Sequence, residues 1–179
     1  MNARQGLGLH AAIGGLVALL SAPAQAAEEQ TVDAFSAWQG RSQIYATGKS
    51  SAVAMATLAG QVYVQTPEGP VYAGEMQCPG MLDVNTQTGL QSGSGHCLIT
   101  AKDGARIFAT WSCKGTLMIG CDGDFAITEG TGRFEGVTGG GPILVRSGVQ
   151  ELVVNLQTGT VDRTATGIVV WRGLRYKLP

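Results

Sequence analysis

Short turn sequences that separate strand-length segments are the feature that most limits what this chain can fold into. They lie at residues 67–70, 86–89, 102–104 and 157–159, and each contains glycine together with proline, threonine or aspartate. Between them, no amphipathic period of 3.6 residues persists through three helical turns, so we predict strands rather than helices. Connections this short join antiparallel neighbours.

The composition agrees with a sheet protein and excludes several other classes. Charged residues make up 14% of the chain, against about a quarter in typical proteins, and glycine contributes 27 of 179 residues. Coiled coils, charged helical bundles and disordered tails need more charge, and a collagen needs a strict glycine repeat. The formal net charge of −1 at pH 7 favours neutral or apolar partners and gives no reason to expect nucleic acid.

Eight segments have the length and composition of strands. A sheet of this size must close into a barrel or split into a sandwich to remove its edges. Adjacent apolar residues, as in Leu98-Ile99 and Ile107-Phe108, point to opposite faces, which suits a closed sheet with a filled lumen. We therefore predict an all-β fold, an eight-stranded, antiparallel, up-and-down closed barrel. The expected strands are residues 36–47, 52–66, 71–83, 90–101, 106–113, 124–128, 143–156 and 160–171.

The first 26 residues have the pattern of a removable export signal. Arg4 precedes an uncharged apolar run at residues 11–20, and the small-residue segment 21–26 ends in Ala-Gln-Ala. The run is shorter than the roughly 20 residues that span a bilayer, so we expect no stable membrane span. We predict a signal peptide at residues 1–26, cleaved after Ala26, and a single domain at residues 27–179. The mature protein is then periplasmic or secreted.

The four cysteines predict two disulfides in an exported chain. A symmetric hairpin turn at residues 86–89 sets Cys78 directly opposite Cys97, within reach of a disulfide. Cys113 and Cys121 then flank a short loop and form the second pair. The spacing contains no close pair of cysteines of the kind that zinc sites use, so we expect no metal.

A second hairpin determines the surroundings of His96, the one histidine of the predicted mature chain. A two-residue turn at residues 103–104 would set His96 opposite Trp111. The same register would turn Cys113 to the other face from Cys97, which argues against a disulfide between them. A histidine beside a tryptophan in a lumen is either a packed residue of the sheet or part of a site.

Five residues are the candidates for a functional site. His96, Trp111 and Phe108 are expected to line a ligand pocket. Histidine is the side chain that most often serves as a general acid or base, so His96 is the candidate for that role. Glu75 and Glu135 are the acids that we consider as catalytic partners inside a cavity. The spacing identifies no carboxylate beside His96, and we expect no cofactor.

The most informative segment is the glycine-rich run at residues 129–141. Its glycines are too dense for a plain strand, so we expect tight backbone turns with Phe134 as an apolar anchor. The Gly-Lys-Ser or Gly-Lys-Thr ending of a phosphate-binding loop is absent from the run. The residues that define the motif are Gly130, Gly132, Phe134, Gly136 and Gly139.

The segment from Gly130 to Gly139 resembles the glycine-rich signature of the allene oxide cyclase barrel-like superfamily, which also includes dirigent proteins. The resemblance implies an eight-stranded antiparallel barrel, here in an exported, bacterial-type member. In that superfamily, cyclases bind an unstable fatty-acid epoxide and guide its ring closure, and dirigent proteins steer radical coupling without an oxidising centre. Their working residues lie outside the signature, so the resemblance assigns no site residue here.

From these features we expect an exported, disulfide-braced barrel that binds a small apolar molecule or a partner, without covalent chemistry. The lumen would be the site. One alternative is a barrel isomerase or cyclase of the allene oxide cyclase type, which would use His96 or a cavity carboxylate. Another is a structural envelope protein with a packed lumen and its function on the outer surface. The volume of the lumen and the position of His96 discriminate among the three.

Overall fold

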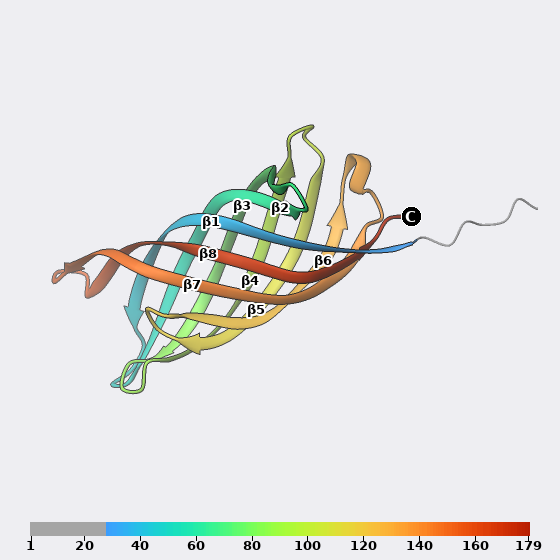
Figure 1. The fold of residues 1–179 in the computed structure, drawn as a ribbon. Coiled ribbons are helices and arrows are strands. Elements are labelled where there is room, and N and C mark those ends of the chain that lie inside the picture. The colour runs from blue at the N-terminus through green and yellow to red at the C-terminus, as the bar shows by residue number, and fades with distance from the viewer. Residues whose placement is uncertain (1–27) are drawn as a thin grey trace, which may run out of the picture.

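The computed structural model describes residues 28–179, and the predicted signal peptide with its cleavage site lies outside the described residues. Eight antiparallel strands form one closed barrel, in which each strand pairs with its neighbours in sequence and β1 pairs with β8 (Figure 1). The predicted fold class is confirmed. The elements are β1 (Glu29–Ala46), β2 (Ser51–Thr66), β3 (Gly69–Asn85), β4 (Leu90–Ala101), β5 (Arg106–Thr116), β6 (Gly120–Gly130), η1 (Gly132–Phe134), β7 (Thr138–Asn155) and β8 (Thr160–Lys177).

Several strands are longer than the sequence pattern predicts. β1 begins at Glu29 rather than at residue 36, because its first residues pair with the end of β8, as in Glu29 with Lys177. β6 begins at Gly120 rather than at residue 124, because its first residues pair with the end of β5. Pairing across the closed sheet thus extends strands into polar and glycine-rich sequence that carries no strand pattern of its own.

Alternate residues of each strand face the lumen, where the core lies. On β1, for example, Ser36 and Trp38 are buried, whereas Ala37 and Gln39 are exposed. The rings of Phe125 and Trp171 meet edge to face inside, with centroids 5.5 Å apart. The period of two that predicted strands therefore also decides which side chains fill the barrel. The buried core residues are Ala34, Trp38, Val62, Met76, Cys78, Cys97, Ala109, Phe125, Ile127, Val137, Ile143, Ala165, Val169 and Trp171.

One end of the barrel, which we call the closed end, carries the β2–β3 and β4–β5 turns and the segment 131–137 that links β6 to β7. Gly132 and Gly136 have positive φ angles of 62° and 75°, which glycine adopts without strain. Phe134 packs against the core beside this segment, as does Leu178 near the end of the chain. The segment therefore turns tightly at these glycines, and it lies over this end of the lumen with Phe134 against the core.

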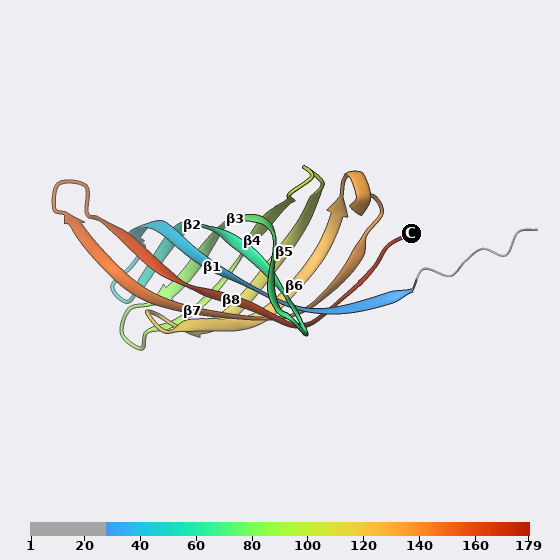
Figure 2. The ribbon, with the colours of Figure 1, turned by 45° about the horizontal axis from the view of Figure 1, so that its top comes forward.

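The opposite end, which we call the mouth, carries the β1–β2, β3–β4, β5–β6 and β7–β8 turns. Only short turns join the strands there, with no linking segment like residues 131–137 in the described chain. β7 pairs with β6 only as far as Arg146, and its later residues pair with β8 alone. This β7–β8 hairpin therefore extends beyond the rest of the barrel (Figures 1 and 2).

The β4–β5 hairpin differs from the sequence prediction by one residue. Its loop has three residues, 102–104, and the flanking residues are joined by a backbone hydrogen bond of 2.8 Å. Gly104 supplies the positive φ, 84°, that such a loop needs. His96 therefore pairs with Thr110 and not with Trp111. The expected register was wrong because a two-residue turn was assumed where the chain makes a three-residue one.

Candidate binding site in the lumen

The lumen retains a narrow cavity on the side of the mouth. Its volume is about 80 Å³. Its lining is mostly apolar and includes both disulfides and all three tryptophans of the chain. Met118 of the β5–β6 turn and Ser147 of β7 also line it, and they lie at the mouth. The cavity has room for a few water molecules or for a small apolar group.

Glycines on the inner wall create the space in which two of the tryptophans lie. A Cβ atom at Gly95 would come within 2.8 Å of Cε2 of Trp111, and one at Gly80 would overlap the same ring. A Cβ atom at Gly167 would come within 2.7 Å of Cζ2 of Trp38. These contacts are too close for any larger residue, so the indole rings lie directly on the backbone of neighbouring strands.

Hydrogen-bond donors of the lumen lack partners. The indole Nε1 atoms of Trp38, Trp111 and Trp171 are buried without a hydrogen bond, and so is the hydroxyl of Ser36. Trp38 and Trp171 are only 5% and 2% exposed. Leaving a buried donor unsatisfied costs about 1–3 kcal/mol.

Both disulfides lie in the wall of this cavity. Cys78 and Cys97 are bonded across β3 and β4, with Cα atoms 4.1 Å apart. Cys113 and Cys121 are bonded across β5 and β6, with Cα atoms 5.6 Å apart. The predicted pairing is confirmed, although the corrected register puts Cys113 on the same, inward face as Cys97. The disulfides therefore brace adjacent strand pairs around the site.

Arg163 of β8 brings a positive charge to the cavity wall. Its Nε donates a hydrogen bond to Ser42 Oγ at 3.2 Å. Among residues 28–179, no carboxylate forms an ion pair with it. Burial lowers the pKa of Arg163 from its ordinary value, because desolvation disfavours the charged form. Arginine nevertheless keeps its charge, so the site holds a cation without a counterion.

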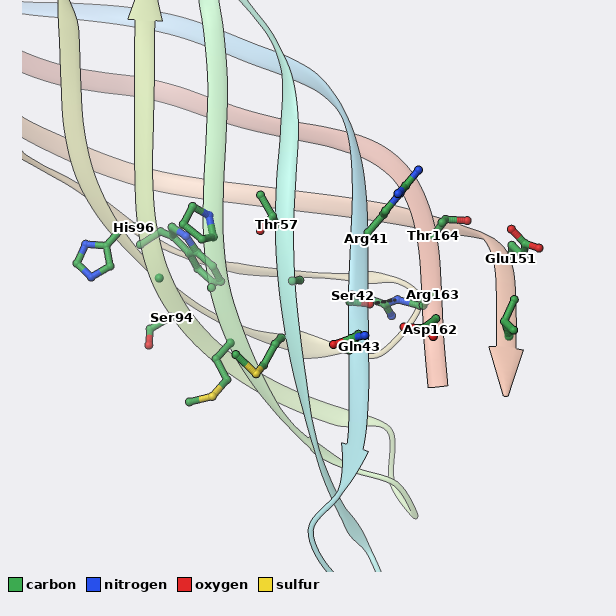
Figure 3. Close-up of a pocket in the computed structure, with 18 of the residues that line it drawn as sticks. Arg41, Ser42, Gln43, Thr57, Ser94, His96, Glu151, Asp162, Arg163 and Thr164 are labelled. Atoms are coloured by element: carbon green, nitrogen blue, oxygen red, sulfur yellow. Dashed lines mark hydrogen bonds between the residues drawn. The ribbon is translucent and has the colours of Figure 1, made fainter. Parts of the chain in front are cut away.

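A larger groove of about 1150 Å³ lies on the outer face of the barrel. Met55 and Met81, cross-strand partners on β2 and β3, line it and are 58% and 50% exposed. In Figure 3, His96 lies at one side of this groove, and Glu151 and Asp162 lie at the opposite side. The groove is open to solvent, and its lining also includes Ser42, Trp111 and Arg163, so it shares part of the barrel wall with the lumen cavity.

The structure separates the three residues predicted to line the ligand site. Trp111 lines the lumen cavity. His96 is exposed on the outer face of β4 and forms no ion pair with a carboxylate of the described residues. Phe108 also faces outward, because its neighbour Ala109 is the inward, buried residue of β5. The lumen pocket therefore contains one of the three.

The two predicted acids are exposed and far from the lumen cavity in the fold. The carboxylate of Glu75, on the outer face of β3, accepts a hydrogen bond of 3.3 Å from the hydroxyl of Tyr72. Glu135 lies in the segment that covers the closed end. Neither acid lines the same pocket as His96. The two predicted acids and His96 are therefore not brought together in one site.

The sequence prediction omits Trp38, Trp171 and Arg163. The sequence contained a signal for Trp171 and Arg163, because residues at even separations on one strand share a face of the sheet. That rule puts Arg163 on the face of Trp171 in β8. The rule does not reveal which face is inside, and the prediction for His96 depended on the incorrect register.

The described residues contain neither a metal-binding cluster nor a helix that could span a membrane. No group of three or more histidine, cysteine, aspartate or glutamate side chains in residues 28–179 is placed to hold a metal ion. Within the same residues, no helix is both long enough and apolar enough to cross a bilayer.

Solved structures similar to this chain include two pterocarpan synthase dirigent proteins, GePTS1 and PsPTS1. GePTS1 is 10% identical, with a TM-score of 0.31 over 90% of this chain and 99% of that chain. PsPTS1 is 14% identical, with a TM-score of 0.34 over 81% of this chain and 96% of that chain. No protein family model and no curated protein matches the sequence. Similarity at this level gives no information about the ligand or the activity of this protein.

Proposed function

We propose that the protein binds a small, largely apolar molecule in its lumen, from the mouth, without covalent chemistry. The observation that carries the proposal is an apolar cavity on the side of the mouth whose wall contains the rings of Trp38, Trp111 and Trp171. A concave apolar site with a few polar groups is the usual form of a small-molecule site.

The size of the cavity limits how a ligand can fit. An apolar cavity of roughly 150 Å³ admits benzene, and the lumen cavity is about 80 Å³. The ligand would place one small group in the lumen and its remainder at the mouth. Met118 lies there and is 52% exposed. Its flexible thioether side chain can swing aside to widen the entrance.

Binding is favoured over the cyclase alternative by the positions of the ionisable groups. A general acid or base must lie within hydrogen-bond reach of the bound molecule, directly or through one water. His96, Glu75 and Glu135 are all exposed, and none lines the lumen cavity. A molecule in the lumen would therefore meet indoles, thioethers, disulfides and Arg163.

We also propose that the chain is exported and cleaved after Ala26, and that it is an exported, bacterial-type relative of the allene oxide cyclase barrel-like superfamily. Two disulfides are typical of oxidising compartments, here the periplasm or the exterior. The motif from Gly130 to Gly139 forms the segment that covers the closed end of an eight-stranded barrel. The intact mass of the exported protein tests the cleavage, since a mature chain that retains residues 1–26 would contradict it.

The experiment that tests binding is native mass spectrometry of the purified protein, followed by a thermal-shift screen of small aromatic and aliphatic compounds. We expect a co-purified molecule or a ligand that raises the melting temperature. Ser147→Leu should fill the entrance of the cavity and abolish the shift. Ser92→Leu, at an exposed position on β4, is the matched control and should preserve it. The proposal fails if no compound binds, or if binding is unaffected by Ser147→Leu.

A further inference from the structure

Among residues 28–179, Arg163 is the only charged residue that lines the lumen cavity. A guanidinium has five N–H donors in a planar fork. The one hydrogen bond that it makes in the described structure, to Ser42 Oγ, uses one of them. The remaining donors border an apolar cavity, where a cation without a counterion is costly. The site therefore lacks an anion.

The acids nearest in sequence do not supply that anion. Asp162 precedes Arg163 on β8 and so points to the opposite face of the strand. It is exposed and lines the outer groove, as Glu151 of β7 does. No aspartate or glutamate is found among the residues that line the lumen cavity. Arg163 is half-buried and also lines the outer groove, but no carboxylate of residues 28–179 forms an ion pair with it, so its charge is available to an anionic group of a ligand.

The position of Arg163 fixes the orientation of a bound anion. Along β8, Arg163 lies nearer the mouth than Gly167 and Trp171 do. The ring of Trp38 leans toward Arg163. On β1, Gly40 is the lumen-facing residue next to Ser42 on the side away from the mouth, and a Cβ atom at Gly40 would lie 3.4 Å from Cζ3 of the Trp38 ring. Passing inward from the mouth, a ligand meets the guanidinium first and the indole donors next.

We propose that the lumen ligand is a compact amphipathic organic anion of the carboxylate type. Its negative group pairs with Arg163 on the mouth side, and its apolar body lies among the tryptophans. This inference rests on the proposed lumen binding and adds the charge of the ligand to it. A planar carboxylate suits the forked guanidinium, which can donate two parallel hydrogen bonds to it.

The test compares two probes with the same propyl chain, one charged and one neutral, butyrate and butyramide, by calorimetry and tryptophan fluorescence. All three tryptophans line the cavity, so their emission reports binding directly. We expect the carboxylate to bind about tenfold or more tightly than the amide, as a charge-assisted hydrogen bond provides. Arg163→Gln should remove that preference. Arg172→Gln, which removes an exposed charge from the same strand, should leave it intact.

Arg163→Lys guards against a folding defect, because it keeps the charge and should keep most of the preference for the carboxylate. Equal binding of both probes to the unmodified protein, unchanged in Arg163→Gln, would overturn the inference while leaving lumen binding in place. Failure of both probes to bind would overturn the inference, and failure of the whole compound screen would overturn lumen binding as well.

Discussion

The two ends of the barrel are formed by the same strands, but one end is covered by a linking segment and the other is not. At the closed end, the segment 131–137 brings Phe134 and Val137 onto the core, and Val137 is 2% exposed. At the mouth, only turns join the strands, and Met118 and Ile119 are 52% and 60% exposed. The alternation of strands is the same at both ends. What differs is one linking segment, and under the proposed function it leaves the mouth as the end at which a ligand enters.

The inner wall differs between the ends in a second way. Toward the mouth, glycines face inward and give their space to indole rings, which leaves a cavity. Toward the closed end, inward positions such as Val62 and Ile127 carry branched side chains that are 5% and 8% exposed. Small residues on a curved sheet thus produce a site only where larger neighbours do not fill the space.

The largest difference in stability is expected between two methionine substitutions, one in the core and one at the mouth. Met76 is 1% exposed, and Met76→Ala should lower the free energy of unfolding by about 2–5 kcal/mol. Met118→Ala, at the mouth, should change it by less than about 0.5 kcal/mol. Urea denaturation measures both. Equal losses would show that the mouth is packed as tightly as the core.

Removing a disulfide should have the next largest effect. Replacing Cys78 and Cys97 together by alanine should cost about 3 kcal/mol, since that bond closes a sequence separation of 19 residues. Replacing Cys113 and Cys121 should cost less, about 2.5 kcal/mol, for a separation of 8. Chemical denaturation under non-reducing conditions compares the two variants. A greater loss for the second pair would mean that its bond at the mouth does more than restrict the unfolded chain.

Gly80→Ala tests the contact between the wall and a tryptophan. A Cβ atom there would overlap the ring of Trp111, so the ring or the strand must move. We expect a loss of about 1–3 kcal/mol and a change in tryptophan emission. Gly148→Ala, where a Cβ atom would meet nothing within 4 Å, is the control and should be neutral or stabilising by up to about 1 kcal/mol. A neutral Gly80→Ala would contradict the described position of Trp111.

The smallest effect is expected at the surface of the closed end. Arg133 and Asp103 form an ion pair of 3.0 Å, with side chains 56% and 48% exposed. Asp103→Asn should lower the free energy of unfolding by less than about 1 kcal/mol, and less still at high salt. Thermal unfolding at two ionic strengths checks this. A large loss that persists in high salt would show that the ion pair helps to hold the covering segment in place.

The fold and the cross-links were accessible from the sequence because both follow from short-range rules. Turn spacing and a period of two predict antiparallel strands, and the turn at residues 86–89 alone sets Cys78 opposite Cys97. These features depend on neighbours in the sequence. Closure of the sheet then follows from the need to remove its edges.

The site was less accessible because it depends on longer-range geometry. A loop of three residues instead of two shifted the partner of His96 from Trp111 to Thr110. Parity along a strand shows which residues share a face but not which face is inside, so His96 was placed in the lumen although it is exposed. Arg163 and the space beside it follow only from the closed barrel.

The most direct test of the account is an NMR titration with the methionine methyl groups labelled with ¹³C. Met76 and Met118 line the lumen cavity, and Met55 and Met81 line the outer groove, so each site has two reporters. When a ligand from the screen, or butyrate, is added, we predict that the signals of Met76 and Met118 shift and those of Met55 and Met81 stay in place. The opposite pattern would contradict the account and move the binding site to the outer face.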